Sequence, residues 1–163
     1  MSISEVGLSK NQANFAALSP LSFLERTRKT FPNHTAIEYK NYQLSYEQAG
    51  SRCDALANFL KKRNIDFGST IAVMLPNIPV MWECHYGIPM ASGVMNAINT
   101  RLDSNTVKFI LEHGEAKLFI YDSLKKFIKP ISAFEEFQKK FTSDFGFCRF
   151  FIDGSTVHQW FNI

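Results

Sequence analysis

The strongest constraint on the fold comes from two apolar runs, TIAVML (Thr70 to Leu75) and KLFIY (Lys117 to Tyr121). Neither run alternates apolar with polar residues, as a strand with one solvated face would. Uninterrupted apolar strands of this kind are typical of a parallel sheet that helices cover on both sides. The two runs therefore predict an α/β fold with helices on both faces of the sheet.

The residues between these runs predict two helices and one short strand. The helices follow the spacing of apolar residues, and Asp103 or Ser104 can cap the second, which ends at Gly114. Pro89 lies in the last turns of the first helix and should kink it. A strand–helix–strand–helix–strand order is that of βαβ units, whose strands are parallel. The five elements are expected at residues 70–75, from Asn77 to near Gly93, and at 94–98, 104–113 and 117–121.

The first part of the chain predicts a helix, a hairpin and a second helix. Ser19-Pro20 has the pattern of an N-cap followed by proline at the first helical position. Strands at 35–39 and 42–45 flank a short turn, whose type the sequence leaves open. Ser45 and Gln48 form a capping box that begins the clearest helix, rich in cations at its end.

The bulk composition limits the class of protein. The chain has 163 residues, enough for one domain, and a net charge of +3, too small to indicate a nucleic-acid partner. Its three cysteines are widely spaced without a CxxC, so neither a disulfide framework nor a zinc site is predicted. No signal-peptide pattern and no apolar run of about 18 residues is present. We therefore expect a cytoplasmic protein.

The glycines do not form a phosphate-binding loop. Such loops need closely spaced glycines, because backbone N–H groups must approach the phosphates. Here no two glycines lie closer than six residues, and no strand is followed by a Ser/Thr/Gly-rich loop. The sequence therefore predicts no nucleotide-phosphate site within this chain.

Cys84-His85 and the three other histidines are the candidates for catalytic or metal-binding groups. Neighbouring residues on a helix point about 100° apart, so Cys84 and His85 cannot form a dyad by themselves. A buried cysteine beside a helix-face histidine is the simpler interpretation. No histidine has the spacing of a metal-ligand pair, so we predict no catalytic residue and no metal site.

Asn99 and Arg101 are the candidate ligand-binding residues. They follow the strand predicted at 94–98, and parallel sheets bind ligands beyond the carboxyl ends of their strands. Arg101 can clamp a carboxylate or phosphate. Alternatively, it pairs with Asp103 or holds a helix terminus.

Lysines alternate with phenylalanines and isoleucines between Ser123 and Phe141. A basic amphipathic helix can lie on a membrane surface. The alternative, which we favour, is a helix that packs on its own sheet with solvated lysines. We therefore do not expect a membrane partner.

Several segments, in order, resemble the opening of the AMP-forming acyl-CoA synthetases of the adenylate-forming superfamily. The resemblance covers Gly7 to Asp122 and weakens to RFFIDG, while STVHQWFNI matches nothing we recognise. It is closest to the subgroup that activates short- and medium-chain fatty or aromatic acids. The segments are KNQANFAALSPLSFLER, NHTAIEY, LSYEQAGSRCDALANFL, TIAVMLPNIPVMWECHYGIPMASGVMNAINTRLD and FILEHGEAKLFIYD.

The resemblance implies a reaction and its cofactors. Enzymes of this family join a carboxylic acid to ATP with Mg²⁺, releasing pyrophosphate, and then pass the acyl group to coenzyme A. Their phosphate loop, adenosine-binding motifs and catalytic lysine lie downstream of every matching segment, so the resemblance assigns no catalytic residue here. It makes residues 74–103 scaffold near the nucleotide site, and we expect no cofactor in this chain itself.

The resemblance also suggests a division of the chain. We expect an N-terminal extension at residues 1–18, an incomplete N-terminal AMP-binding domain at 19–153 and an unmatched tail at 154–163. One hypothesis is an inactive piece of a ligase, left by truncation or gene decay. The other is a non-catalytic interaction module or one half of a split ligase, which binds a partner chain or a second copy through open sheet edges. Whether the chain is an enzyme is left open.

Overall fold

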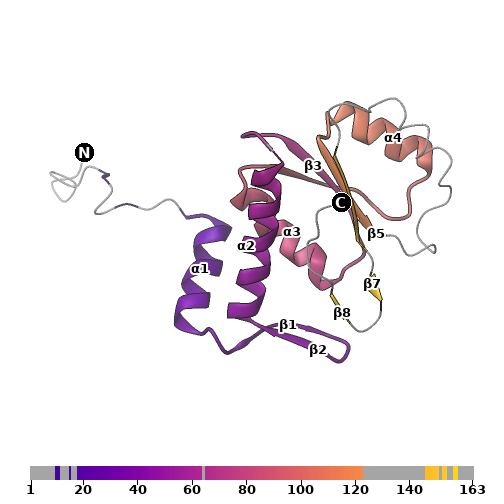
Figure 1. Cartoon of the computed structure of the whole chain (residues 1–163). Coiled ribbons are helices and arrows are strands. Elements are labelled where there is room, and N and C mark those ends of the chain that lie inside the picture. Colours follow the sequence, from indigo (N-terminus) through magenta and orange to yellow (C-terminus); the bar gives the residue numbers. More distant parts are fainter. Residues whose placement is uncertain are drawn as a thin grey trace, which may run out of the picture.

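The computed structural model describes residues 10–11, 15, 18–63 and 65–122, and the backbone of three strands between 146 and 157. These residues form an α/β arrangement around a parallel sheet (Figure 1). The elements are α1 (Pro20–Thr30), β1 (Thr35–Tyr39), β2 (Tyr42–Ser45), α2 (Tyr46–Lys62), β3 (Thr70–Met74), α3 (Pro79–Met90), β4 (Val94–Ala97), α4 (Ser104–His113), β5 (Leu118–Asp122), β6 (Gly146–Phe150), β7 (Ile152–Asp153) and β8 (Thr156–Val157).

The main sheet has the strand order β4-β3-β5-β6, and all of its described pairs are parallel. The two uninterrupted apolar runs became β3 and β5, which lie side by side at its centre with Ile71 opposite Leu118. Both strands are covered on both faces, as a parallel sheet requires. The predicted α/β class and parallel sheet are confirmed.

Successive residues of β3 and β5 enter two separate cores, because side chains alternate across a strand. One core joins Ile71, Val73 and Ile120 to α2 and α3. The other joins Ala72 and Phe119 to α4. Figure 1 shows α4 on the opposite side of the sheet from α2 and α3. The prediction of helices on both faces is therefore confirmed.

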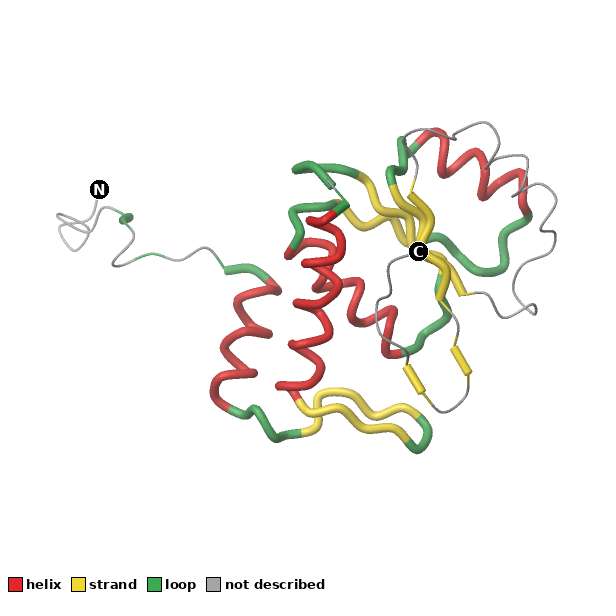
Figure 2. The backbone as a smooth tube through the Cα atoms, in the orientation of Figure 1, coloured by secondary structure: helices red, strands yellow, loops and turns green. Residues whose placement is uncertain are grey.

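The N-terminal helices begin where their caps predict. The Ser19 and Ser45 hydroxyls each accept a hydrogen bond from the N–H three residues on. In return, the side-chain oxygens of Ser22 and Gln48 accept hydrogen bonds from the N–H groups of Ser19 and Ser45. The two strands between these helices form a separate two-stranded antiparallel sheet, away from the main sheet (Figure 2). Lys40 takes a φ of 54° in its turn, a left-handed conformation that a lysine adopts at some cost.

Several boundaries differ from those expected. Helix α3 begins at Pro79 rather than Asn77, because Pro79 takes a first-turn position where its missing N–H is not needed. It ends at Met90, three residues before Gly93. The segment RFFIDG, at residues 149–154, contributes to both β6 and β7.

Two expectations from the sequence stay predictions. The basic segment at 123–141 lies outside the described residues. No described helix is long and apolar enough to cross a membrane. The division at residues 18 and 153 stays a prediction.

Candidate functional site

Asn99 and Arg101 lie on the loop that follows β4, at the carboxyl edge of the main sheet. The loop begins at Ile98, whose N–H donates a hydrogen bond to the Val73 carbonyl oxygen at 2.8 Å. The Asn99 side-chain oxygen then accepts a hydrogen bond from the Arg101 N–H at 2.9 Å. This local bond makes a turn of the kind that asparagine favours. Both side chains are exposed.

Asp103, the predicted alternative partner of Arg101, has a different role. Its carboxylate accepts hydrogen bonds from the Thr106 hydroxyl and from the N–H groups of Thr106 and Asn105. The Thr106 bonds lower the pKa of Asp103 most. These contacts cap α4, and no ion pair between Arg101 and Asp103 is found among the described residues. The role of Asn99 and Arg101 in ligand binding stays a prediction.

Cys84 and His85 lie in different surroundings on α3, as their adjacent positions on a helix predict. Cys84 is fully buried in the core between α2 and α3. His85 is exposed, and its Nδ1 lies 2.7 Å from the Met81 carbonyl oxygen. That carbonyl can only accept, so Nδ1 carries the proton and donates.

An open groove of about 620 Å³ lies between the outer side of α3 and the hairpin, and we call it the aromatic groove. Its aromatic rings include Trp82 and Tyr86, whose centroids are 4.5 Å apart on successive turns of α3. The full lining is Pro20, Ile37, Glu38, Tyr39, Asn77, Ile78, Pro79, Met81, Trp82, His85 and Tyr86. Its size and mainly apolar lining are those of a binding site.

Sequence reasoning missed this groove. The spacing of Trp82 and Tyr86 is visible in the sequence and indicates that both lie on one side of a helix. Nothing local indicates that Tyr39, more than forty residues earlier, lies across from them. That juxtaposition depends on how the hairpin packs.

A buried ion pair joins α2 to α3. Arg52 donates to both oxygens of Glu83, at 2.6 and 3.2 Å, and Glu83 has no exposed surface. Burial raises the pKa of Glu83, while the Arg52 contact opposes that shift. Burial also raises the pKa of the nearby Cys53 thiol to about 12, so this cysteine is unreactive at neutral pH.

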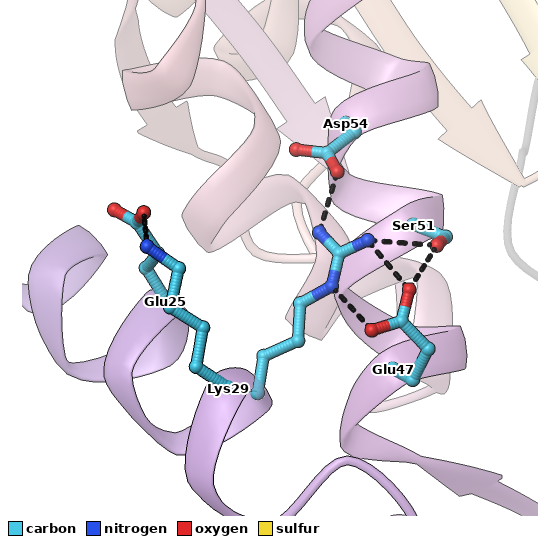
Figure 3. Close-up of polar contacts among 6 residues, drawn as sticks. Glu25, Lys29, Glu47, Ser51 and Asp54 are labelled. Atoms are coloured by element: carbon cyan, nitrogen blue, oxygen red, sulfur yellow. Dashed lines mark hydrogen bonds and ion pairs between the residues drawn. The ribbon is translucent and has the colours of Figure 1, made fainter.

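An exposed polar cluster joins α1 to α2. Arg28 donates to both oxygens of Glu47, at 2.9 and 2.7 Å, and to Asp54 at 2.6 Å and Ser51 at 3.1 Å (Figure 3). All of its acceptors belong to α2, so the cluster fixes one helix on another. Arg28 uses four of its five N–H groups in these contacts, and its charge faces two carboxylates, so the cluster has a structural role.

The part of the chain that the structure describes contains no group of three or more His, Cys, Asp or Glu side chains able to hold a metal ion. The expectation that the chain binds no metal stays a prediction.

Comparison with known families gives one match over most of the chain. A family model described as "AMP-binding enzyme" matches residues 24–148. The match spans every described element from β1 to β5, together with the last turns of α1 and the start of β6.

Curated plant proteins are similar to about two thirds or more of the chain. The peroxisomal trans-cinnamate:CoA ligase of Petunia hybrida is 43% identical over 115 residues, which are 71% of this chain and 20% of that protein. The peroxisomal benzoate–CoA ligase of Arabidopsis thaliana is 39% identical over 111 residues, or 68% of this chain and 19% of that protein. The chain thus spans about a fifth of the length of these relatives.

Solved structures share the fold at lower identity. Coronafacic acid ligase from Pectobacterium brasiliense superposes with a TM-score of 0.72 and 18% identity, over 88% of this chain and 28% of that one. A fatty acyl CoA synthetase from Mycobacterium tuberculosis has a TM-score of 0.66 and 21% identity, over 78% and 26%. At these identities the likeness shows the fold alone.

Proposed function

This chain belongs to the AMP-binding enzyme family, and we propose that it forms the N-terminal part of an AMP-forming acyl-CoA ligase. One observation carries the proposal. The relatives that match the family region at 43% and 39% identity are named as CoA ligases of carboxylic acids. The parallel sheet and its two cores supply the scaffold for that activity.

The described residues do not fit an ATP–magnesium site by themselves. The loop after β4 offers Arg101 as a single cation, and that after β3 continues through Pro76 into the aromatic groove. Neither loop has the closely spaced glycines that hold phosphates. We therefore assign no chemical step to this chain alone, and ATP, Mg²⁺ and coenzyme A belong to the proposed whole ligase.

We propose a small carboxylic acid as the substrate of that whole ligase. The names of the relatives include trans-cinnamate and benzoate, and another relative from Arabidopsis thaliana is an acetate/butyrate–CoA ligase. A role in fatty acid metabolism is one version of this proposal. The same three relatives are named as peroxisomal, so the peroxisome is the alternative to the cytoplasmic location expected from the sequence.

An assay of the full chain tests the proposal that it is inactive alone. The chain is mixed with Mg-ATP, coenzyme A and each of cinnamate, benzoate, butyrate and acetate, and release of pyrophosphate is measured. We expect no acid-dependent release. The complete Petunia ligase in the same assay is the positive control. Acid-dependent release by this chain would overturn the assignment of catalysis to residues outside it.

A chimera tests the proposal that the chain is a ligase part. The 115-residue matched region of the Petunia ligase is replaced by the corresponding region of this chain. We expect cinnamate-dependent pyrophosphate release within about tenfold of the parent, since tenfold is only about 1.4 kcal/mol of barrier. A chimera that folds but has no activity would count against the proposal.

The same chimera tests Asn99 and Arg101. If Arg101 holds an anionic group of ATP or of the acid, Arg101→Gln should raise one KM without lowering the melting temperature. Lys108→Gln, which replaces a cation on α4, is the control. Equal KM values in both variants would leave Arg101 as a loop residue only.

A second candidate function is a non-catalytic interaction module. The aromatic groove is the observation that favours it, because half-buried aromatic rings are typical anchors of protein interfaces. The two candidates are compatible when the partner is the remainder of a ligase.

A further inference from the structure

Phe67 is 92% exposed, more than any other large apolar side chain that the structure describes. It lies in a turn between α2 and β3, which the Ser69 N–H closes by donating to the Asp66 carbonyl oxygen at 3.0 Å. Gly68 has a φ of 79° in this turn, a conformation that favours glycine. The backbone therefore defines the turn, and nothing in its conformation requires an aromatic side chain at Phe67.

Backbone hydrogen bonds attach this turn to the loop before β4. The Gly68 N–H donates to the Ser92 carbonyl oxygen at 2.9 Å. The Val94 N–H donates to the Ser69 carbonyl oxygen at the same distance of 2.9 Å, and the Val94 side chain is 53% exposed. Both loops lie at the amino edge of the main sheet, because β3 and β4 are parallel and begin there (Figure 2). Two exposed apolar side chains, Phe67 and Val94, thus belong to adjoining loops.

Three cations precede the turn, where α2 ends. The Lys61 and Lys62 side chains are exposed. The Arg63 guanidinium lies over the Phe59 ring, 4.7 Å from its centroid. Asp66 is the one carboxylate between the cations and the end of the turn. Cations stabilise the negative end of a helix dipole, which explains their position but not the exposed ring beyond them.

Other exposed charges at the amino edge belong to other elements. Glu112 lies on α4, on the opposite face of the sheet from α2 (Figure 1). Glu115 and Lys117 precede β5, which pairs with the side of β3 away from β4. The positive charge is therefore concentrated where α2 ends, in the segment that contains Phe67.

We propose that an amino-edge patch, formed by Lys61, Lys62, Phe67 and Val94, binds the surface of an anionic lipid bilayer. Proteins that lie on membranes combine cations, which approach the anionic headgroups, with apolar side chains that enter the acyl boundary. The patch has both. A side chain that is 92% exposed protrudes from the surface, and a fluid bilayer accommodates it without a complementary pocket.

This inference does not rest on the proposed function. The patch is also a different surface from the basic segment at 123–141, from which no membrane partner is expected. Asn99 and Arg101 follow the carboxyl end of β4, at the opposite edge of the sheet. A bilayer bound at the amino edge therefore leaves the candidate ligand loop accessible.

Co-sedimentation with vesicles tests the proposal. The purified full chain is mixed with vesicles of phosphatidylcholine alone, or of phosphatidylcholine and phosphatidylserine in equal amounts. We expect binding to the anionic vesicles that weakens as salt is added, because salt screens the cation contacts. Equal binding to both kinds of vesicle, or binding to neither, would overturn the proposal.

Substitutions assign the binding to the patch. Lys61→Gln/Lys62→Gln should weaken binding to anionic vesicles by about thirtyfold, since each cation near such a surface contributes about fivefold. Phe67→Ser should weaken it by about tenfold or more, because the ring no longer enters the acyl boundary. The matched control is Phe23→Ser/Arg26→Gln, which removes an exposed ring and an exposed cation from α1 and should keep most of the binding.

Two results of these substitutions would contradict the assignment. Equal weakening by the α1 control and the patch variants would show a general effect of charge and apolar surface. Binding that survives the patch substitutions would come from another part of the chain. All of the substituted side chains are exposed, so each variant should keep the melting temperature of the parent.

A fluorescent reporter tests insertion while an aromatic ring is kept. The emission of Phe67→Trp should shift to shorter wavelength when anionic vesicles are added, because the indole leaves water. Phe23→Trp should show no such shift. The parent chain, with its two tryptophans, supplies the background emission. The same response from both variants would overturn insertion at Phe67.

Discussion

The α2–α3 and α1–α2 interfaces are built from the same parts and differ in burial. In each interface an arginine donates hydrogen bonds to both oxygens of one carboxylate, and the shortest nitrogen–oxygen distance is 2.6 Å in both. Glu83, between α2 and α3, has no exposed surface, whereas the Glu47 and Asp54 side chains are 52% and 48% exposed. Distance alone therefore does not rank the two contacts, because water screens one and not the other.

Two glycines show the same contrast between a buried and an exposed contact. A Cβ added at Gly87 would lie 2.7 Å from Leu56 Cδ2, in the core between α2 and α3. One added at Gly50 would lie 2.7 Å from Cδ of Arg28, a flexible side chain at the surface. The α2–α3 interface is thus a packed core that tolerates little added volume, whereas at Gly50 the neighbour on α1 is a flexible arginine side chain.

The largest expected effect comes from Arg52→Met. The substitution leaves the Glu83 carboxylate buried without its partner, and breaking a buried pair in this way costs about 3–5 kcal/mol. Urea unfolding of the full chain measures the loss. The double variant Arg52→Met/Glu83→Leu is the control and should recover most of the stability, since apolar replacement of both partners is often neutral. A single variant as stable as the parent would show that water reaches Glu83.

The two glycines give the next largest contrast. Gly87→Ala should cost about 1–3 kcal/mol by overpacking Leu56. Gly50→Ala should gain up to about 1 kcal/mol from the higher helix propensity of alanine. The added methyl group meets only the flexible Arg28 side chain, which can move away, so the net effect on stability should be small. Thermal unfolding of both variants checks this order. Equal losses would mean that Arg28 is held as rigidly as the core.

The pH dependence of stability should have opposite signs for the two interfaces. Because the pKa of Glu83 is raised in the native state, the folded protein keeps this proton to a higher pH than the unfolded chain does. Glu83 therefore lowers the stability as the pH rises from its unfolded pKa to its folded pKa. Arg28 lowers the pKa of Glu47, whose contribution is present above its unfolded pKa and lost as pH falls through the folded one.

Urea unfolding at a series of pH values tests these signs. Glu83→Gln should remove the loss of stability above the unfolded carboxyl pKa, and Glu47→Gln should reduce the loss below it. Identical pH profiles in the two variants would contradict the assigned shifts.

The smallest expected effect comes from Arg28→Met. Exposed ion pairs contribute little and are screened by salt, so the global stability should fall far less than in Arg52→Met. Hydrogen exchange should show faster opening of α1 with α2 unchanged. A loss as large as that of Arg52→Met would show that the two interfaces are equivalent, contrary to their burial.

Local sequence patterns predicted most of the elements correctly. The capping box at Ser45 and the N-cap pattern of Ser19-Pro20 placed two helix starts, and the apolar runs placed β3 and β5 to within one residue. The predicted start of α3 at Asn77 was wrong, because Pro79 occupies the first helical position. Asn99 and Arg101 lie on the loop after β4, as the predicted strand implies, and their role as a binding site stays a prediction.

The sequence by itself determined the α/β class, the family and the positions of the helices and strands. Those features depend on contacts between residues close in the chain, such as caps, periodicity and uninterrupted apolar runs. Only the tertiary structure decided the strand order β4-β3-β5-β6, the burial of Glu83 against Arg52 and the meeting of Tyr39 with Trp82 across the aromatic groove. These features join residues that are distant in sequence, and their energies depend on burial and packing that no local pattern records.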